Sequence, residues 1–300
     1  MQKWTYLLHN YKESLKRIRS LFKEVVLLMF KDKVSLIGLS ILLIFIFAGI
    51  IGPLVISPPE PSPQIYAPPS LKHPFGTDFQ GEDIFSLIIY GTPFMLLTAF
   101  IVSAVTTLIS VILGTVAGYI GKLADTLIMG AADIMLAIPQ LPLLLILAVL
   151  IKSMNIITLS LLISALSWPT AARAFRSQIL SLKERDFVES SRLLGFNSVE
   201  IIVYDLIPNI LPYIAINLIL NAIYAIYIVA SLAYLGFIPF SSANWGVMLY
   251  QAWAFGTIYN RQTFMYVMAP IMAIVMLQVG LMLFSRAFEV IFNPRVRSGE

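Results

Sequence analysis

Long apolar stretches alternate with shorter polar or basic segments over most of the chain. The first stretch, at 34–56, has no charged residue and is longer than the roughly 20 apolar residues that a helix needs to cross a bilayer. Five further spans are expected at 93–120, 126–150, 156–172, 209–236 and 263–284. The pattern predicts an all-α, polytopic membrane protein with six transmembrane helices, of which the last five form a core over 93–292.

The segments that flank the spans differ in composition. Residues 1–33 carry apolar side chains at helical spacing with basic residues between them, which favours an amphipathic helix on the inner membrane surface. A tail that orders only against lipid is the alternative. The proline-rich start of 57–92 predicts an ordered loop outside the cell, and we expect residues 293–300 to form a tail inside it.

The outer loop brings one histidine and three carboxylates close together in sequence: His73, Asp78, Glu82 and Asp83. Their spacing matches no calcium-binding loop, and carboxylates at such positions more often cap a helix. We therefore expect capping here and no metal site. The chain contains no cysteine, which excludes disulfides and thiolate metal sites.

The third span contains two prolines, Pro139 and Pro142, and is predicted to be kinked or broken. Asp133, near its inner end, is the charged residue that we place within a span. A carboxylate inside the membrane indicates function by default. The alternative is that Asp133 accepts hydrogen bonds from a neighbouring helix.

The polar segment 181–208 interrupts the apolar pattern between the fourth and fifth spans. Two residue pairs in it have the spacing of a capping box, which starts a helix: Ser181 with Glu184, and Asn197 with Glu200. Gly195 between them predicts a helix stop, and Pro208 is expected to end the second helix. The segment is therefore predicted to be a helix, a tight turn and a second helix.

The fifth span carries polar side chains along one face. At 100° per residue the following positions fall within one arc: Asn209, Tyr213, Asn217, Asn221, Tyr224, Tyr227, Ser231 and Tyr234. Such a stripe suggests a wall that faces water or cargo, with Asn217, Asn221, Tyr224, Tyr227 and Ser231 as its candidate lining residues. Hydrogen bonding between helices is the alternative explanation.

Composition and charge agree with a membrane protein. The chain is 59% hydrophobic and 12% charged, whereas about a quarter of the residues of soluble proteins are charged. The net charge of +4 does not indicate nucleic-acid binding, because the basic residues lie between the spans. In the six-span topology every Lys and Arg except Lys72, Lys152 and Arg261 falls on the inside, which places both termini in the cytoplasm of a cell-membrane protein.

The segment 181–208 resembles the EAA loop of permease subunits of ABC importers. That pattern reads Glu-Ala-Ala, three residues, Gly, nine residues, Ile, any residue, Leu-Pro. Here Glu189-Ser190-Ser191 stands for Glu-Ala-Ala, Gly195 is the glycine, and Asp205-Leu206-Ile207-Pro208 closes the pattern at the same spacing. Other stretches resemble the second permease of the peptide/nickel branch: those from His73, Asp125, Ser231, Ala243 and Asn293.

The resemblance implies a type I ABC importer permease fold whose loop couples to an ATPase. The coupling residues would be Glu189, Ser190, Ser191, Gly195, Asp205, Ile207 and Pro208. It also implies a second permease subunit, two cytoplasmic ATPases that bind ATP and Mg²⁺, and an extracellular solute-binding protein. This chain itself would hold no cofactor and catalyse no reaction, and peptides are the expected cargo, with oligosaccharides or another solute as the alternative.

Some positions depart from the family's pattern. Glu82 stands where the family commonly has Arg, Val229 where it often has an acidic residue, and Asp205 where the pattern has Ile. Contacts that depend on those groups do not carry over to this chain.

Two other functional classes fit the sequence less well. An ion-coupled secondary transporter should show matching broken helices and a buried ion site, which we do not find in the sequence. A membrane-embedded hydrolase needs a nucleophile and a base at membrane depth, but both histidines, His9 and His73, fall outside the predicted spans. The Gly121-Lys122 pair is no phosphate-binding loop, because Leu123 replaces the required Ser or Thr.

Overall fold

The computed structural model describes residues 32–151, 155–238, 243–257 and 263–292, and these are largely helical, without a strand. The predicted amphipathic helix at 1–33, apart from its last two residues, and the tail at 293–300 lie outside the described residues. The helices are α2 (Lys33–Val55), α3 (Ile84–Ile120), α4 (Lys122–Ala137), α5 (Gln140–Leu150), α6 (Ile156–Leu182), α7 (Asp186–Leu193), α8 (Ser198–Ile201), η1 (Ile202–Leu206), α9 (Ile207–Tyr234), α10 (Trp245–Ala254) and α11 (Phe264–Phe292).

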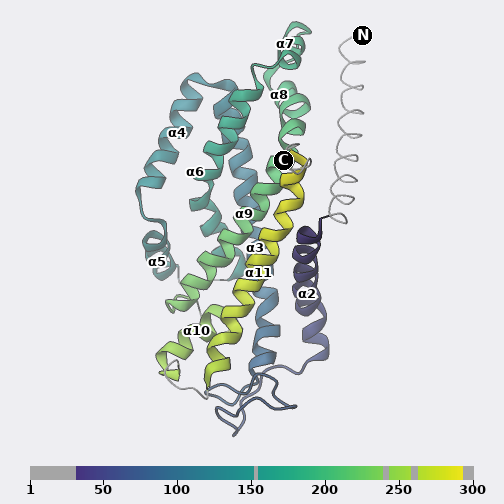
Figure 1. Ribbon diagram of the computed structural model, residues 1–300. Helices are drawn as coiled ribbons and strands as arrows, with labels where there is room; N and C mark the ends of the chain where they lie inside the picture. Colours follow the sequence, from purple (N-terminus) through teal and green to yellow (C-terminus); the bar gives the residue numbers. More distant parts are fainter. Residues whose placement is uncertain (1–31, 152–154, 239–242, 258–262, 293–300) are drawn as a thin grey trace.

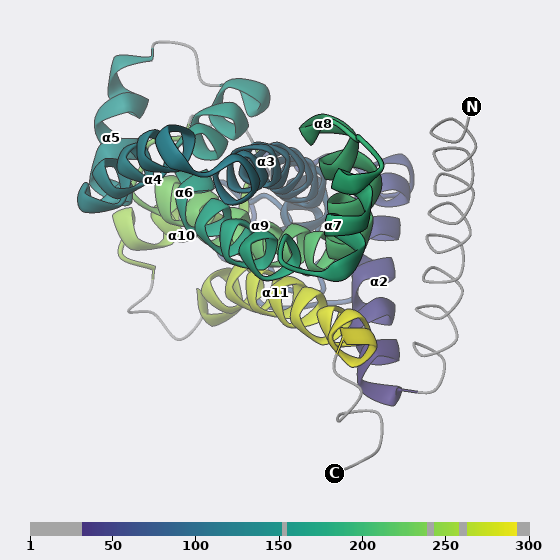
Figure 2. The same cartoon turned by 90° about the horizontal axis from the view of Figure 1, so that it is seen from above.

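The long helices form one bundle with a distinct segment at each end (Figure 1). The short helices α7 and α8 lie at one end, and α10 lies at the other end with the loop before α3. Seen along the bundle, α2 flanks one side and α4 with α5 the opposite side (Figure 2). We call the α7 end the inner end and the α10 end the outer end, following the predicted topology.

Among the described residues, five helices are long and apolar enough to cross a membrane, and the pair α4 and α5 adds a sixth span if it is counted as one. The two helices of this pair meet at 84°, which confirms the predicted break in the third span. Pro139 lies at the break and Pro142 in the first turn of α5, where a missing N–H costs no helical hydrogen bond. The six-span, all-α prediction therefore agrees with the structure.

Several helix boundaries differ from the prediction, among them the end of α11, which runs to Phe292 rather than to residue 284. Helix α3 begins at Ile84 rather than at residue 93, because the Asp83 carboxylate caps it by accepting the Ser86 N–H at 2.8 Å. Pro93 is accommodated inside this helix. Helix α6 runs ten residues beyond its expected end at residue 172, because Phe175 and Ile179 continue to be buried against the bundle.

Helices α3 and α6 pack closely and form the centre of the inner half. A Cβ atom added to Gly114 would lie 2.5 Å from the Ala172 carbonyl oxygen, and one added to Gly118 would lie 2.9 Å from that of Arg176. The two glycines therefore let the helix backbones approach each other, as in other membrane bundles. This rigid pair carries the segment that follows α6.

Candidate functional site

The segment 181–208 forms a two-helix projection at the inner end of the bundle (Figure 1). Helix α7 follows α6 after three residues, and the chain then turns and re-enters the bundle through α8, η1 and α9. The predicted helix, turn and helix are thus present, but their boundaries differ in two places.

One of the two predicted capping boxes is wrong and the other is confirmed. Ser181 lies in the last turn of α6, and α7 begins with Arg185 as its N-cap, without a side-chain hydrogen bond. The buried Ile179 keeps this part of the chain in α6, so the local signal at Ser181 is overridden by packing. At the second box the Asn197 side chain accepts the Glu200 N–H at 2.9 Å, and the Glu200 carboxylate accepts the Asn197 N–H at 2.7 Å.

Gly195 ends α7 in a left-handed conformation, with φ of +80°. Its N–H donates to the Arg192 carbonyl oxygen at 3.0 Å, and the Phe196 N–H donates to that of Ser191 at 3.1 Å. This pair of bonds is the Schellman arrangement, in which glycine avoids the Cβ penalty of positive φ. No atom would contact an added Cβ, so the conformation alone favours glycine at this position.

Pro208 does not end the second helix, which corrects our prediction. Residues Ser198–Tyr234 form one continuous helical stretch, with a π-helical turn at Ile202–Leu206 just before the proline. Pro208 has no N–H to donate, and a wider turn there lets the chain continue without that bond. The Asp205 carbonyl oxygen in this turn accepts from the Asn209 side chain at 2.6 Å. The projection is thereby joined directly to α9.

One face of the projection is anchored in an apolar cluster. Val188, Phe196, Ile201 and Leu206 are each less than 10% exposed. They pack with buried residues of α3, α6 and α9, namely Val111, Ala171, Phe175, Ile179 and Ile210. Burial of this apolar surface fixes the position of α7 on the ends of the long helices.

The opposite face of the projection is exposed and mixes apolar with charged side chains. Leu193 is 84% exposed, Leu194 47% and Val199 68%. Glu189 and Ser190 are exposed beside them, and the Ser190 hydroxyl donates to the Asp186 carbonyl oxygen at 2.8 Å. Several large apolar side chains on a short, anchored helix are typical of a surface that binds another protein.

The remaining predicted coupling residues point inward. Ser191 is 1% exposed, Pro208 is also buried, and Ile207 is half-buried. Asp205 is 8% exposed and lies beside the Ser191 hydroxyl, but one of its carboxylate oxygens has no hydrogen-bond partner among the described residues. The two serines of the loop therefore have different environments, since Ser190 faces outward and Ser191 packs beneath α7.

Ion pairs connect α4 to α6 near the projection. Arg176 donates from two nitrogens to the two carboxylate oxygens of Asp125, each at 2.5 Å. Arg173 pairs with Asp133, and both side chains of that pair are exposed. The Lys183 ammonium donates to the Gly118 carbonyl oxygen at 3.1 Å. The carboxylate of Asp133 thus accepts from a neighbouring helix, which was the second of the two interpretations of this residue.

Three of the predicted lining residues lie in the middle part of α9 and form hydrogen bonds within this chain. Asn217 is buried and donates to the Tyr213 carbonyl oxygen at 2.9 Å. Asn221 donates to the Thr107 hydroxyl of α3 at 2.9 Å. The Tyr224 hydroxyl donates to the side-chain oxygen of Gln140 at 2.7 Å.

The other two lining candidates lie farther along α9. Tyr227 is 54% exposed, and the Ser231 hydroxyl donates to the Tyr227 carbonyl oxygen at 2.8 Å. The stripe is therefore divided: its middle part joins helices, and the part toward α10 leaves an aromatic side chain exposed.

Gln140 is a polar residue of this region that the sequence analysis missed. Besides accepting from Tyr224, it donates to the Ser167 hydroxyl at 2.8 Å, so it connects α5 with both α6 and α9. Its side chain is the only polar one in α5, and it directly follows Pro139 at the break. A lone amide beside a helix-breaking proline was the signal that could have found it.

The arrangement at the inner end offers a docking surface. In the described part of the chain no three His, Asp or Glu side chains gather closely enough to hold a metal ion. Of the carboxylates at this end, Asp125 and Asp133 are paired with arginines, Glu189 is on the surface, and Asp205 is buried beneath the projection.

Comparison with known proteins gives two family matches. Residues 110–298 match the family described as binding-protein-dependent transport system inner membrane component. Residues 20–74 match the N-terminal TM domain of oligopeptide transport permease C. The first match covers more than half of the chain, including the whole of the segment 181–208.

Individual proteins of known family are similar over most of their length. The oligopeptide transport system permease protein OppC of Bacillus subtilis is 30% identical over 78% of this chain and 77% of its own length. The dipeptide transport system permease protein DppC of the same organism is 33% identical over 73% of this chain and 69% of its own length. The protein of that name from Alkalihalophilus pseudofirmus is 34% identical over 77% of this chain and 76% of its own length.

Proposed function

Since this chain belongs to the family of binding-protein-dependent transport system inner membrane components, in its peptide-type ABC permease branch, we propose that it is one of two permease subunits of an ATP-driven peptide importer. The chain is a multi-pass membrane permease. In the proposed machine two cytoplasmic ATPases bind ATP and Mg²⁺ and hydrolyse the nucleotide, and an extracellular solute-binding protein delivers the cargo. This chain holds no cofactor and performs no covalent chemistry.

The observation that carries the proposal is the two-faced α7. Its inner face is fixed by Val188 in the apolar cluster, while Glu189 and Leu193 are exposed on its outer face. A helix that is anchored on one side can transmit a displacement of its partner to α6 and α9, because closely packed elements move as rigid bodies. We assign Glu189, Ser190 and the exposed leucines to the ATPase contact. Ser191, Asp205, Ile207 and Pro208 form the connection to the bundle.

Substitutions at Gly195 test the coupling role. Gly195→Val forces a β-branched residue into positive φ, so α7 loses its turn, and we expect co-purification of the ATPases and peptide uptake to fall at least about tenfold. Gly195→Asn should largely keep both, because asparagine tolerates this conformation. Gly130→Val is the matched control, since Gly130 has equally open surroundings but lies within α4.

The amount of each variant in the membrane is measured as well, because co-purification of the ATPases is informative only for a variant that inserts normally. If Gly195→Val inserts normally and still retains its ATPases at the wild-type level, α7 is not the coupling element. If none of the three variants nor the wild type co-purifies an ATPase, the proposed machine itself is wrong.

Peptide cargo is proposed from what the relatives' names say they transport. The exposed Tyr227, with Ser231 beside it, gives α9 an aromatic and polar surface that the second permease would complete into a pathway. Reconstituted vesicles that contain the full assembly should take up labelled di- or oligopeptides only with ATP and the solute-binding protein. Uptake of an oligosaccharide instead would change the cargo, and uptake driven by an ion gradient without ATP would exclude the ABC mechanism.

A further inference from the structure

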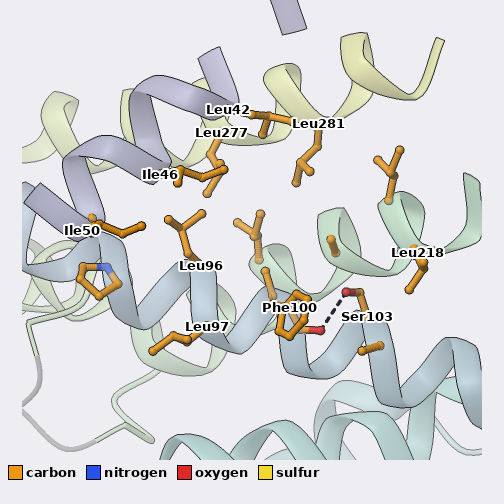
Figure 3. A pocket seen from close by; sticks show the side chains of 17 residues that line it. Leu42, Ile46, Ile50, Leu96, Leu97, Phe100, Ser103, Leu218, Leu277 and Leu281 are labelled. Carbon is orange, nitrogen blue, oxygen red and sulfur yellow. Dashed lines mark hydrogen bonds between the residues drawn. The ribbon is translucent and has the colours of Figure 1, made fainter. Parts of the chain in front are cut away.

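A large apolar cavity opens on the side of the bundle between α2 and the other helices (Figure 3). Its volume is about 710 Å³, and its walls come from the middle parts of α2, α3, α9 and α11. Ile46, Leu96 and Leu281 are among the side chains that point into it. At its rim Ile50 is 65% exposed and Phe100 70% exposed, so the cavity is open to whatever surrounds the helices.

The cavity exists because the closest approaches of the α2 backbone to the other helices lie on either side of it. Near the inner end, a Cβ atom on Gly38 would lie 2.4 Å from the backbone nitrogen of Phe284 in α11. Near the outer end, a Cβ on Gly52 would lie 2.3 Å from the Ile89 side chain of α3. These glycine contacts hold α2 in place on either side of a gap, and only 11% of the residues in its apolar window are buried.

The chemistry of the walls decides what can fill the gap. Among the lining residues Ser103 alone has a polar side chain, and its hydroxyl already donates to the Phe100 carbonyl oxygen at 3.0 Å (Figure 3). Water needs two or more polar partners to remain in a cavity, so water is not a stable occupant. An empty apolar cavity is unfavourable in proportion to its volume.

The same walls do not suit a peptide or a helix. A transported peptide would leave its backbone N–H and C=O groups without partners in such surroundings. A helix of a partner protein is rigid and about 10 Å wide, so it can cover the mouth of the cavity but cannot follow its walls inward. A flexible hydrocarbon chain has neither problem, and hydrocarbon is the medium beside the middle of a transmembrane helix.

We propose that this cavity is a lipid site, in which a phospholipid acyl chain lies between α2 and the helices α3, α9 and α11. The headgroup remains at the membrane surface, where no residue of the cavity is required to bind it. The chain fills the gap between the two glycine contacts and completes the packing of α2. The site would therefore retain a phospholipid more tightly than the rest of the protein surface.

A variant that fills the cavity tests this proposal by lipid counting. Ala104 lines the cavity and is half-exposed, so Ala104→Phe places a ring in the gap with little steric conflict. Ala48→Phe, on α2 but outside the lining, is the control for introducing a phenylalanine elsewhere on this side of the bundle. The full-length protein, with the subunits that co-purify, is examined by native mass spectrometry in increasing detergent. We expect wild type and Ala48→Phe to keep a phospholipid that Ala104→Phe loses.

Fluorescence locates the retained chain independently of that variant. Phe100→Trp places a reporter at the rim, and Leu108→Trp places one on the same helix at a 60% exposed position outside the lining. Brominated-acyl phosphatidylcholine should quench the first at a several-fold lower lipid-to-protein ratio than the second. Equal quenching of both reporters, or equal lipid retention by the two phenylalanine variants when both are monodisperse, overturns the proposal.

A protein occupant gives a different result. Because the chain has no cysteine, a single Leu97→Cys at the rim can be cross-linked to cysteines placed along the second permease. We expect no efficient cross-link when lipid is present. A strong cross-link at one register would show that a partner helix covers the cavity and would contradict the lipid site.

Discussion

The two ends of the bundle each carry a short helix, and the two helices are attached in different ways. At the outer end, α10 buries five of its ten residues, including Trp245, which is completely buried. At the inner end, α7 buries two of its eight residues. Trp245 also donates its indole N–H to the Ile88 carbonyl oxygen at 3.0 Å. The outer helix is thus part of the folded core, whereas the inner helix has a large free surface.

This difference indicates how each end contributes to function. A helix whose packing is complete within its own chain stabilises the fold and has little surface left for a partner. A helix such as α7, which exposes Leu193 on an anchored base, gains packing only when another protein covers it. The predictions below change one end at a time and ask whether stability or association responds.

The largest effect is expected from Trp245→Ala at the outer end. The substitution removes a buried ring that packs against Phe45 at 5.7 Å between ring centroids, and it leaves a cavity beside Gly91. We expect a loss of about 3–5 kcal/mol in unfolding free energy, the usual range for such truncations. Chemical unfolding of the purified protein in detergent measures it.

Trp253→Ala is the matched control on the same helix, since Trp253 is 54% exposed. It should change stability by less than about 1 kcal/mol. Equal losses for the two tryptophans would mean that α10 is not held by its buried face, and the contrast between the two ends would disappear.

A smaller effect, on association rather than on stability, is expected from Leu193→Ser at the inner end. Removing an exposed leucine costs the fold little, but it removes apolar surface from the proposed ATPase contact. We expect association with the ATPases to weaken by about tenfold, equivalent to about 1.4 kcal/mol, with unchanged stability. Titration of the ATPase onto the reconstituted permease measures the change.

The control for Leu193→Ser is the same substitution at the other end of the bundle, Leu71→Ser. Leu71 is fully exposed in the outer loop. Leu71→Ser should affect neither the stability of the permease nor its association with the ATPases. If both variants bind the ATPase normally, the exposed leucine of α7 is not part of the contact.

Local signals in the sequence predicted local structure well. The capping box at Asn197 and the stop at Gly195 depend on residues within one turn of each other, and both are present. The Ser181 signal has the same form, but it was wrong because Ile179 packs against residues far along the chain and keeps α6 helical. Sequence rules for caps describe the competing local states and not the packing that selects between them.

Contacts between distant helices were not predictable from the sequence. Asp133 was recognised as unusual, but its pairing with Arg173 across forty residues appears only in the folded bundle. Pro208 was expected to stop a helix, whereas a π-helical turn before it lets the helix continue into α9. The same limit applies to the candidate site, where the sequence named Ser190 and Ser191 together although one is exposed and the other buried.

The smallest effect is expected at Asp205, which lies in the π-helical turn beneath the projection. A buried carboxylate with an unpartnered oxygen is unfavourable, because its desolvation is not compensated by a hydrogen bond. Asp205→Asn keeps the shape and removes the charge, so we expect the isolated permease to become more stable by about 1 kcal/mol. Glu184→Gln removes an exposed charge nearby and should leave stability unchanged. A loss of stability in Asp205→Asn would instead show that this carboxylate has a partner within the permease, such as the Ser191 hydroxyl, and the inner end would then be more completely packed than the comparison with α10 implies.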